Sequence, residues 1–159
     1  MVDLDDIYNL RILELAANIP RSQRLKHPDA TASAHSKLCG STISIDLNVR
    51  EGSIVDFAQT VKACLLGQAS AAIVGREIVG TTADEFRSVA AAMRMMLKAN
   101  GPPPAGRWAD LALLAPVKDY THRQPSTLLV FDAVEKALDE LGSRAPARAA
   151  VPAPAKTSS

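Results

Sequence analysis

The sequence predicts an α+β fold, in which a small antiparallel β-sheet is covered on one face by helices. Three observations support this prediction. Residues 42–49 alternate between apolar and polar side chains, as a half-buried strand does. Glu51 and Gly52 form a turn that leads into a second alternating segment, 54–61, so the two segments make a hairpin. The remaining segments have helical periodicity, and strands followed by a run of helices are typical of this fold class.

Before the hairpin, residues 4–19 place apolar side chains on one face of an amphipathic helix that Pro20 stops. Residues 21–37 are polar, which indicates a loop with room for a short edge strand at its end. Within the hairpin, the side chains expected to face the helices are Ile43, Ile45, Leu47, Val49, Val55, Phe57 and Val61.

Four helical segments are predicted after the hairpin. They span residues 65–79, 82–98, 108–114 and 126–141. The second opens with a Thr82 to Glu85 capping box, and the third is expected to end at Pro116. Ser126 is interpreted as the N-cap of the last helix.

The length of 159 residues fits one domain, predicted over residues 1–142, followed by an Ala/Pro-rich tail over 143–159 that we expect to be disordered. The formal net charge of +1 and the lack of a basic cluster argue against nucleic acid as a partner. No apolar run is long enough for a membrane span. The acidic N-terminus does not resemble a signal peptide, so a cytoplasmic location is expected.

The two cysteines, Cys39 and Cys64, both flank regular elements. If the hairpin forms, Cys39 before its first strand and Cys64 after its second lie at the same end of the sheet. A helix N-terminus and the nearby Lys62 both stabilise a thiolate at Cys64. Two interpretations stay open at this point, a reactive pair and a pair of small buried side chains.

A metal site built on two thiols needs further ligands. His122 is the best candidate, because its loop precedes the last helix. The other candidates are His27, His35, Asp119 and Asp132. The sequence has no serine-hydrolase elbow, glycine-rich phosphate loop or closely spaced metal motif, so it is not predicted to be an enzyme.

Several segments together resemble the NifU/IscU-type iron–sulfur cluster assembly scaffold family, in order and over roughly residues 4–142. The segment Leu38-Cys39-Gly40 resembles the Cys-Gly-Asp turn of that family, and the segment that begins at Cys64 resembles its second-cysteine motif. Further similar segments are Gly80 with Thr82 to Glu85, Pro116-Val117-Lys118, and Phe131-Asp132-Ala133-Val134.

The resemblance implies a NifU/IscU-like fold and a transient iron–sulfur cluster as cargo. In the family, three cysteines with a nearby aspartate and histidine hold the cluster. Cys39 and Cys64 match two of these cysteines, whereas Ser41 stands at the aspartate position and Ser126 at the third-cysteine position. A serine hydroxyl is a poor ligand for iron beside a thiolate. His122 lies in an apparent insertion and is the residue available to replace the lost ligand.

By resemblance, the function expected is that of a scaffold or carrier that receives sulfur and iron at Cys39 and Cys64. Its partners would be a cysteine desulfurase and cluster-acceptor proteins. Zinc at the same site, or no cofactor at all, are alternatives that the incomplete ligand set leaves open. The alternative function is a non-catalytic NifU-like interaction protein or accessory subunit of a larger complex that has lost cluster binding.

Overall fold

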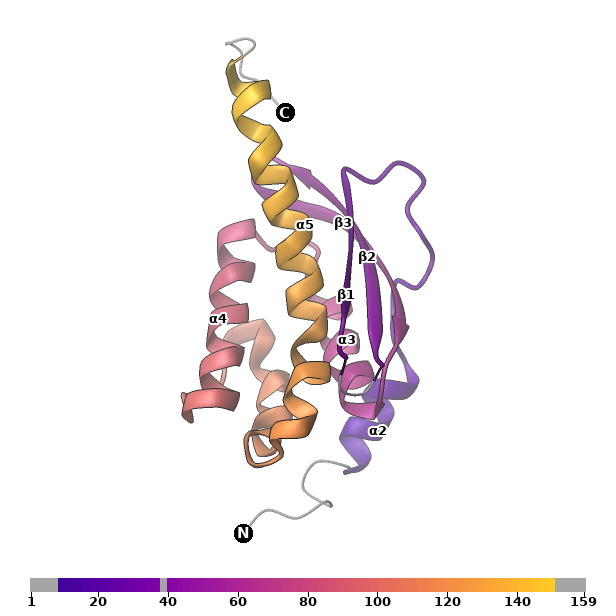
Figure 1. Cartoon of the computed structure of the whole chain (residues 1–159), viewed down its shortest axis with the longest axis vertical. Coiled ribbons are helices and arrows are strands. Elements are labelled where there is room, and N and C mark those ends of the chain that lie inside the picture. Colours follow the sequence, from indigo (N-terminus) through magenta and orange to yellow (C-terminus); the bar gives the residue numbers. More distant parts are fainter. Residues whose placement is uncertain (1–8, 38–39, 151–159) are drawn as a thin grey trace.

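The computed structural model describes residues 9–37 and 40–150, with side chains described as far as residue 142. Its elements in chain order are α2 (Leu10–Ala17), β1 (Ala30–His35), β2 (Thr42–Arg50), β3 (Ser53–Lys62), α3 (Leu65–Glu77), α4 (Ala83–Ala99), the 3₁₀ helices η1 (Gly106–Asp119) and η2 (Thr121–Arg123), and α5 (Gln124–Ala150). The strands form one antiparallel sheet in the order β1-β2-β3, and α5 runs along one face of it (Figure 1). The predicted α+β fold, with an edge strand before the hairpin, is confirmed.

The β2–β3 hairpin turns at Glu51 and Gly52, as the sequence predicts. Both residues have positive φ, 54° and 80°, which is the backbone of the two-residue turns that match the twist of the flanking strands. The pairing runs from Arg50 opposite Ser53 to Thr42 opposite Lys62, at the other end of the hairpin. The hairpin therefore brings the start of β2 and the end of β3 together.

A β-bulge corrects the predicted inner face of β3. The pairing shifts between Asn48 and Val49, so that Asn48 lies opposite Asp56 whereas Val49 lies opposite Ile54. Val55 has no partner in this register and is 45% exposed, while Ile54 is fully buried. The prediction that Val55 faces the helices is wrong, because one extra residue in a strand reverses the alternation on one side of it.

The helical segments form largely where the periodicity places them. Thr82 caps α4 by accepting a hydrogen bond from the backbone N–H of Glu85 at 3.0 Å, as the capping motif predicts. The apolar face of α4 is buried, and it consists of Phe86, Val89, Ala90, Met93, Met96 and Leu97. At its other end α4 stops at Asn100, whose left-handed backbone (φ 57°) is a common helix C-terminus.

Two predicted helix boundaries are wrong. Pro116 lies inside η1 instead of closing a helix before it, because the φ that proline imposes is also that of a 3₁₀ helix. Ser126 is not an N-cap, since α5 begins at Gln124 directly after η2. The Ser126 hydroxyl instead donates to the carbonyl oxygen of Arg123, one turn earlier, at 3.2 Å.

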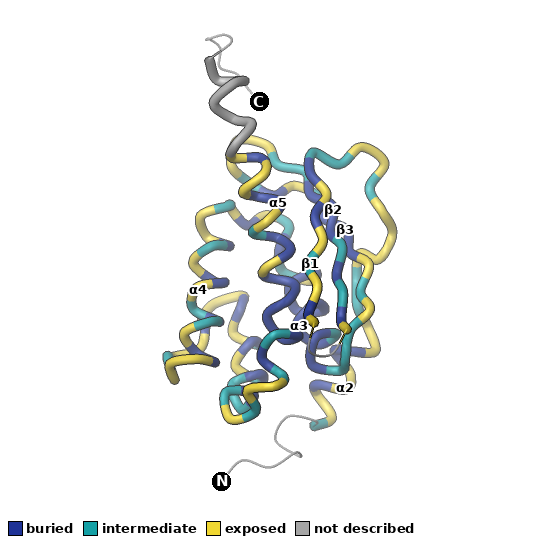
Figure 2. The backbone as a smooth tube through the Cα atoms, viewed as in Figure 1, coloured by how far each residue is buried: buried dark blue, intermediate teal, exposed yellow. Residues whose placement is uncertain are grey.

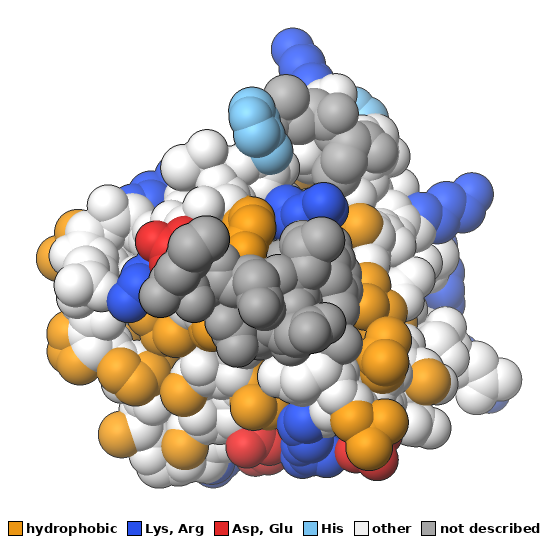
Figure 3. Space-filling view, turned by 90° about the horizontal axis from the view of Figure 1, so that it is seen from below, with side chains coloured by type: hydrophobic (Ala, Val, Ile, Leu, Met, Phe, Trp, Pro, Cys, Tyr) orange, Lys and Arg blue, Asp and Glu red, His pale blue; other side chains and the backbone are white. Residues whose placement is uncertain are grey.

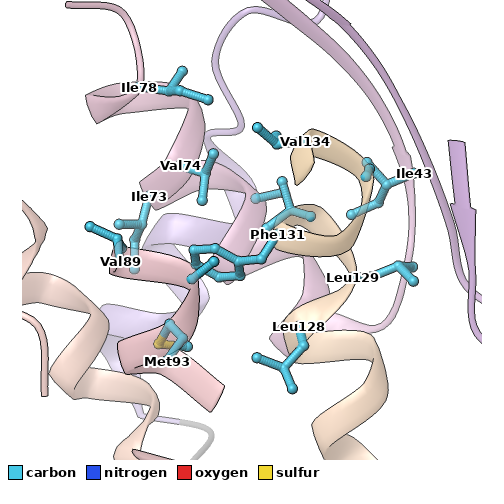
Figure 4. Close-up of a cluster of buried hydrophobic side chains, with 14 of the residues drawn as sticks. Ile43, Ile73, Val74, Ile78, Val89, Met93, Leu128, Leu129, Phe131 and Val134 are labelled. Carbon is cyan, nitrogen blue, oxygen red and sulfur yellow. The ribbon is translucent and has the colours of Figure 1, made fainter. Parts of the chain in front are cut away.

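The core lies between the sheet and the helices, where the buried residues of α5 and the inner sheet face meet (Figure 2). Phe131 of α5 is at its centre, among side chains that come from α3, α4 and β2 (Figure 4). The ring of Phe131 stacks on Phe86, with centroids 5.7 Å apart, and Phe86 packs edge-on against Trp108. This aromatic group holds α4, η1 and α5 in register, and thereby fixes where α5 begins relative to the sheet.

The helix α5 continues to Ala150, beyond the boundary predicted at residue 141. Residues 151–159 lie outside the described part of the chain, so the division into a domain and a disordered tail stays a prediction. Among the described residues, none of the helices combines the length and apolar character that crossing a membrane requires.

Candidate functional site

Cys64 lies at the junction between β3 and α3, where it occupies the N-cap position of the helix. Its backbone is extended (φ −66°, ψ 172°), and its carbonyl accepts the first helical hydrogen bond, from Gln68, at 2.9 Å. Its side chain does not cap the helix but is half-buried against the core. The thiol is therefore placed at the positive end of the α3 dipole, as the sequence indicates.

The Cys64 thiol contacts a residue that is distant in the sequence. Cys64 Sγ and Ser126 Oγ are 3.1 Å apart. A hydroxyl has one proton, so the Cys64 S–H is the donor while Ser126 donates to the Arg123 carbonyl oxygen, and donation by Ser126 to the sulfur would replace that bond. Ser126 is 2% exposed and belongs to the first turn of α5. The structure therefore brings together two of the predicted site residues, Cys64 and Ser126.

The first turn of α3 packs closely against the first turn of α5 at Gly67. A Cβ atom on Gly67 would lie 2.8 Å from the Cβ of Ala63 and 3.1 Å from the carbonyl oxygen of Ser126. Real Cβ atoms essentially never make contacts below 3.0 Å, so a larger residue could not sit here without movement of the backbone. Gly67 is not among the site residues predicted from the sequence. The available signal was a glycine within the first turn of a helix, where it costs stability relative to alanine.

The other predicted cysteine, Cys39, lies outside the described residues, but the chain on either side of it is described. His35 pairs with Thr42, which in turn pairs with Lys62, so the β1–β2 turn and the segment leading to Cys64 lie at the same end of the sheet. Ser41, another predicted site residue, is 3% exposed, and its carbonyl accepts a hydrogen bond from the N–H of Ser36.

The end of the molecule seen in Figure 3 carries hydrophobic, basic and acidic side chains, with no single kind covering it. The end of the sheet with the β1–β2 turn faces this view, and the exposed Lys62 is the last residue of β3. Among the described residues visible in this view, the mixture of side chains agrees with the near-zero net charge.

The additional ligands considered from the sequence are not drawn together. His122 is an exposed residue of η2, and His27, His35 and Asp119 are also exposed. Asp132 is held in an ion pair with Arg94, at 2.7 Å. Within the described ranges, His, Cys, Asp and Glu side chains do not form a group of three or more that could hold a metal ion.

A separate polar cluster surrounds Asp46 on β2. Burial by itself raises the pKa of Asp46, but hydrogen bonds from Arg24, Thr31 and the N–H of Leu25 outweigh it, so the pKa lies below its ordinary value. Arg24 binds both carboxylate oxygens, at 2.8 and 3.0 Å. The carboxylate is thus fully engaged in fixing the 21–29 loop to the sheet, which indicates a structural role.

No protein-family model matches the chain. A crystal structure of a nitrogen-fixing NifU-like protein (N-terminal) from Brucella abortus is 52% identical, covers 89% of this chain and 98% of its own, and superposes with a TM-score of 0.87. The iron–sulfur cluster assembly scaffold protein IscU of Thermotoga maritima is 26% identical over 137 residues, which are 85% of this chain and 94% of that protein.

A more distant structure agrees in fold. A candidate iron–sulfur cluster assembly scaffold protein of the SUF system, from Fervidobacterium islandicum AW-1, has a TM-score of 0.78 at 19% identity. It covers 86% of this chain and 99% of its own. At that identity the likeness shows the shared architecture alone.

Proposed function

Because the chain belongs to the NifU/IscU-type iron–sulfur scaffold family, we propose that it receives sulfur and iron at a site built around Cys64 and Cys39. Scaffolds of this family are not enzymes, in agreement with the sequence analysis. The cluster in this proposal is transient cargo and not a resident cofactor, and it is passed on to an acceptor protein.

One observation carries the proposal: the contact of 3.1 Å between Cys64 Sγ and Ser126 Oγ. It joins the two residues that the resemblance puts at the second- and third-cysteine positions of the family, at the sheet end where the β1–β2 turn also lies. This contact supports a site at that place, with a hydroxyl where the family has a thiol.

The chemistry that this chain supplies is sulfur acceptance followed by iron binding. A Cys64 thiolate attacks the outer sulfur of a donor persulfide, as a cysteine desulfurase would present it. A new S–S bond forms at Cys64, the S–S bond of the donor breaks, and the donor leaves as a thiolate, so this transfer step needs no external electrons. Conversion of the accepted sulfur to the sulfide of a cluster takes two further electrons per sulfur atom, which an external electron-donor protein or small-molecule reductant must supply. Ser126 fixes the position of the Cys64 sulfur, and Cys39 supplies the second thiolate for iron.

Purification without air tests the proposal, with iron, zinc and acid-labile sulfide measured for each mole of protein. We expect bound iron and sulfide in the native chain and their loss in both C39S and C64S. Ser88→Cys on the exposed surface of α4 serves as a control for a thiol added elsewhere. Unchanged metal and sulfide content in both cysteine variants would refute the proposal, while zinc without sulfide would point to a zinc-held site.

The accessory-subunit alternative is favoured by a different observation. The described residues hold no group of three metal-binding side chains, and the resemblance puts serine at the aspartate position (Ser41) and at the third-cysteine position (Ser126) of the family. This function predicts a stable partner after gentle purification, no bound metal, and a Cys64 thiol that resists alkylation until the protein unfolds. Rapid native alkylation of Cys64 together with iron and sulfide in the purified protein would exclude it.

A further inference from the structure

Gly67 is the point at which the first turns of α3 and α5 approach each other. We infer that Gly67 is a positioning residue, whose missing side chain sets the distance between the Cys64 thiol and Ser126. This inference rests on the function proposed above and extends it to a residue outside the ligand set.

Two close approaches restrict the space at position 67. The hypothetical Cβ at position 67 lies 2.8 Å from the Cβ of Ala63, an atom bound directly to the backbone of the residue before Cys64. It also lies 3.1 Å from the backbone oxygen of Ser126. Neither neighbour is the far end of a flexible side chain, so relief requires movement of the backbone at Ala63 or at the start of α5.

Both movements change the same contact. Shifting Ala63 moves Cys64, which follows it in the chain, and shifting the first turn of α5 moves the hydroxyl of Ser126. The contact between Cys64 Sγ and Ser126 Oγ is 3.1 Å. A displacement of a few tenths of an ångström at either backbone changes the distance and orientation of the two groups, and geometric demands at reactive groups are of that order.

Gly75 is also crowded, but the atom 2.6 Å from its added Cβ is Nε2 of Gln59, the far end of a flexible side chain. A Cβ on Gly142 of α5 would meet nothing within 4 Å, so Gly142→Ala is a matched control for a glycine-to-alanine change in a helix. Gly67→Ala removes the same conformational freedom but adds a methyl group between the two first turns. A difference in behaviour between these two variants therefore measures the effect of the added methyl group between the two helix starts, and not the effect of helix propensity.

The test uses a proximity measurement that does not need cluster loading. In a C39S/S126C background, the rate of disulfide formation between Cys64 and the introduced thiol is followed with a fixed excess of oxidised glutathione. We expect Gly67→Ala to slow closure at least about tenfold, since a misplacement of about 1 Å costs up to about 100-fold in such reactions. Gly142→Ala should leave the rate unchanged.

Circular dichroism establishes that each variant is folded. If Gly67→Ala does not fold, A63G/G67A removes the shortest contact and keeps the approach to the Ser126 carbonyl, and slow closure is expected there too. A rate of disulfide closure in the folded variant within twofold of the rate in the C39S/S126C parent would overturn the inference. Iron and sulfide loading is measured in parallel on the otherwise native chain. If that chain binds no iron or sulfide while the rate of disulfide closure still depends on Gly67, the proposed function is refuted and the positioning role of Gly67 stands.

Discussion

Cys64 and Ser126 are 62 positions apart in the sequence, and their side-chain heteroatoms lie 3.1 Å from each other. Cys64 is placed by the start of α3, and Ser126 by the start of α5. The contact therefore depends on the packing of two helix N-termini, and the first prediction follows from it.

Replacing Ser126 by cysteine should increase the amount of cluster that the protein retains. The sulfur would enter at the position of the present hydroxyl, where a thiolate is the better ligand for iron. We expect higher iron and sulfide content after reconstitution without air, and slower loss of both on exposure to a chelator. Ser88→Cys on α4 is the control, and equal retention in the two variants would contradict the prediction.

Asp46→Asn should destabilise the fold by about 1–3 kcal/mol at neutral pH, because the amide cannot accept from Arg24 on both sides. The pKa of Asp46 is lowered in the folded state, so its contribution is present above the unfolded pKa and is lost as pH falls through the folded pKa. Urea denaturation at several pH values checks this: the difference between the variants should shrink in acid, and a constant difference would argue against an ionic contribution.

Phe131→Ala should cost about 3–5 kcal/mol of the free energy of unfolding, as is usual for a large buried aromatic ring. Phe131 is fully buried and stacks on Phe86, so the loss removes packing from α4 and α5 together. Phe131→Leu, which keeps most of the volume, should cost less. Thermal denaturation followed by circular dichroism gives both values, and equal losses would mean that the volume of the cavity left behind does not set the cost.

The bulge in β3 predicts a contrast between adjacent residues. Ile54→Ala should destabilise by about 2–5 kcal/mol, whereas Val55→Ala should stay within about 1 kcal/mol. Ile54 is fully buried and Val55 is 45% exposed. Denaturant titration of the two variants tests the strand register directly. A larger loss of stability in Val55→Ala than in Ile54→Ala would mean that Val55 is the buried residue, as the alternation in the sequence predicts.

Much of the fold could be predicted from local pattern. Some features depend on only a few neighbouring residues and can be identified directly in the sequence. These are the alternation in residues 42–49, the Glu51-Gly52 turn and the capping hydroxyl of Thr82. The bulge at Val55 could not be found in this way. One extra residue in a strand is invisible until the partner strand fixes the register.

By itself, the sequence determined the α+β class, the placement of Cys64 at a helix start, and the resemblance that proved to be family membership. Only the tertiary structure decided which candidates meet. It placed Ser126 beside Cys64, left His122 exposed, and showed Gly67 between the two first turns. The physical reason is that local propensity depends on neighbouring residues, while the distance between two helix ends depends on the packing of the whole core, from Phe131 to the inner face of the sheet.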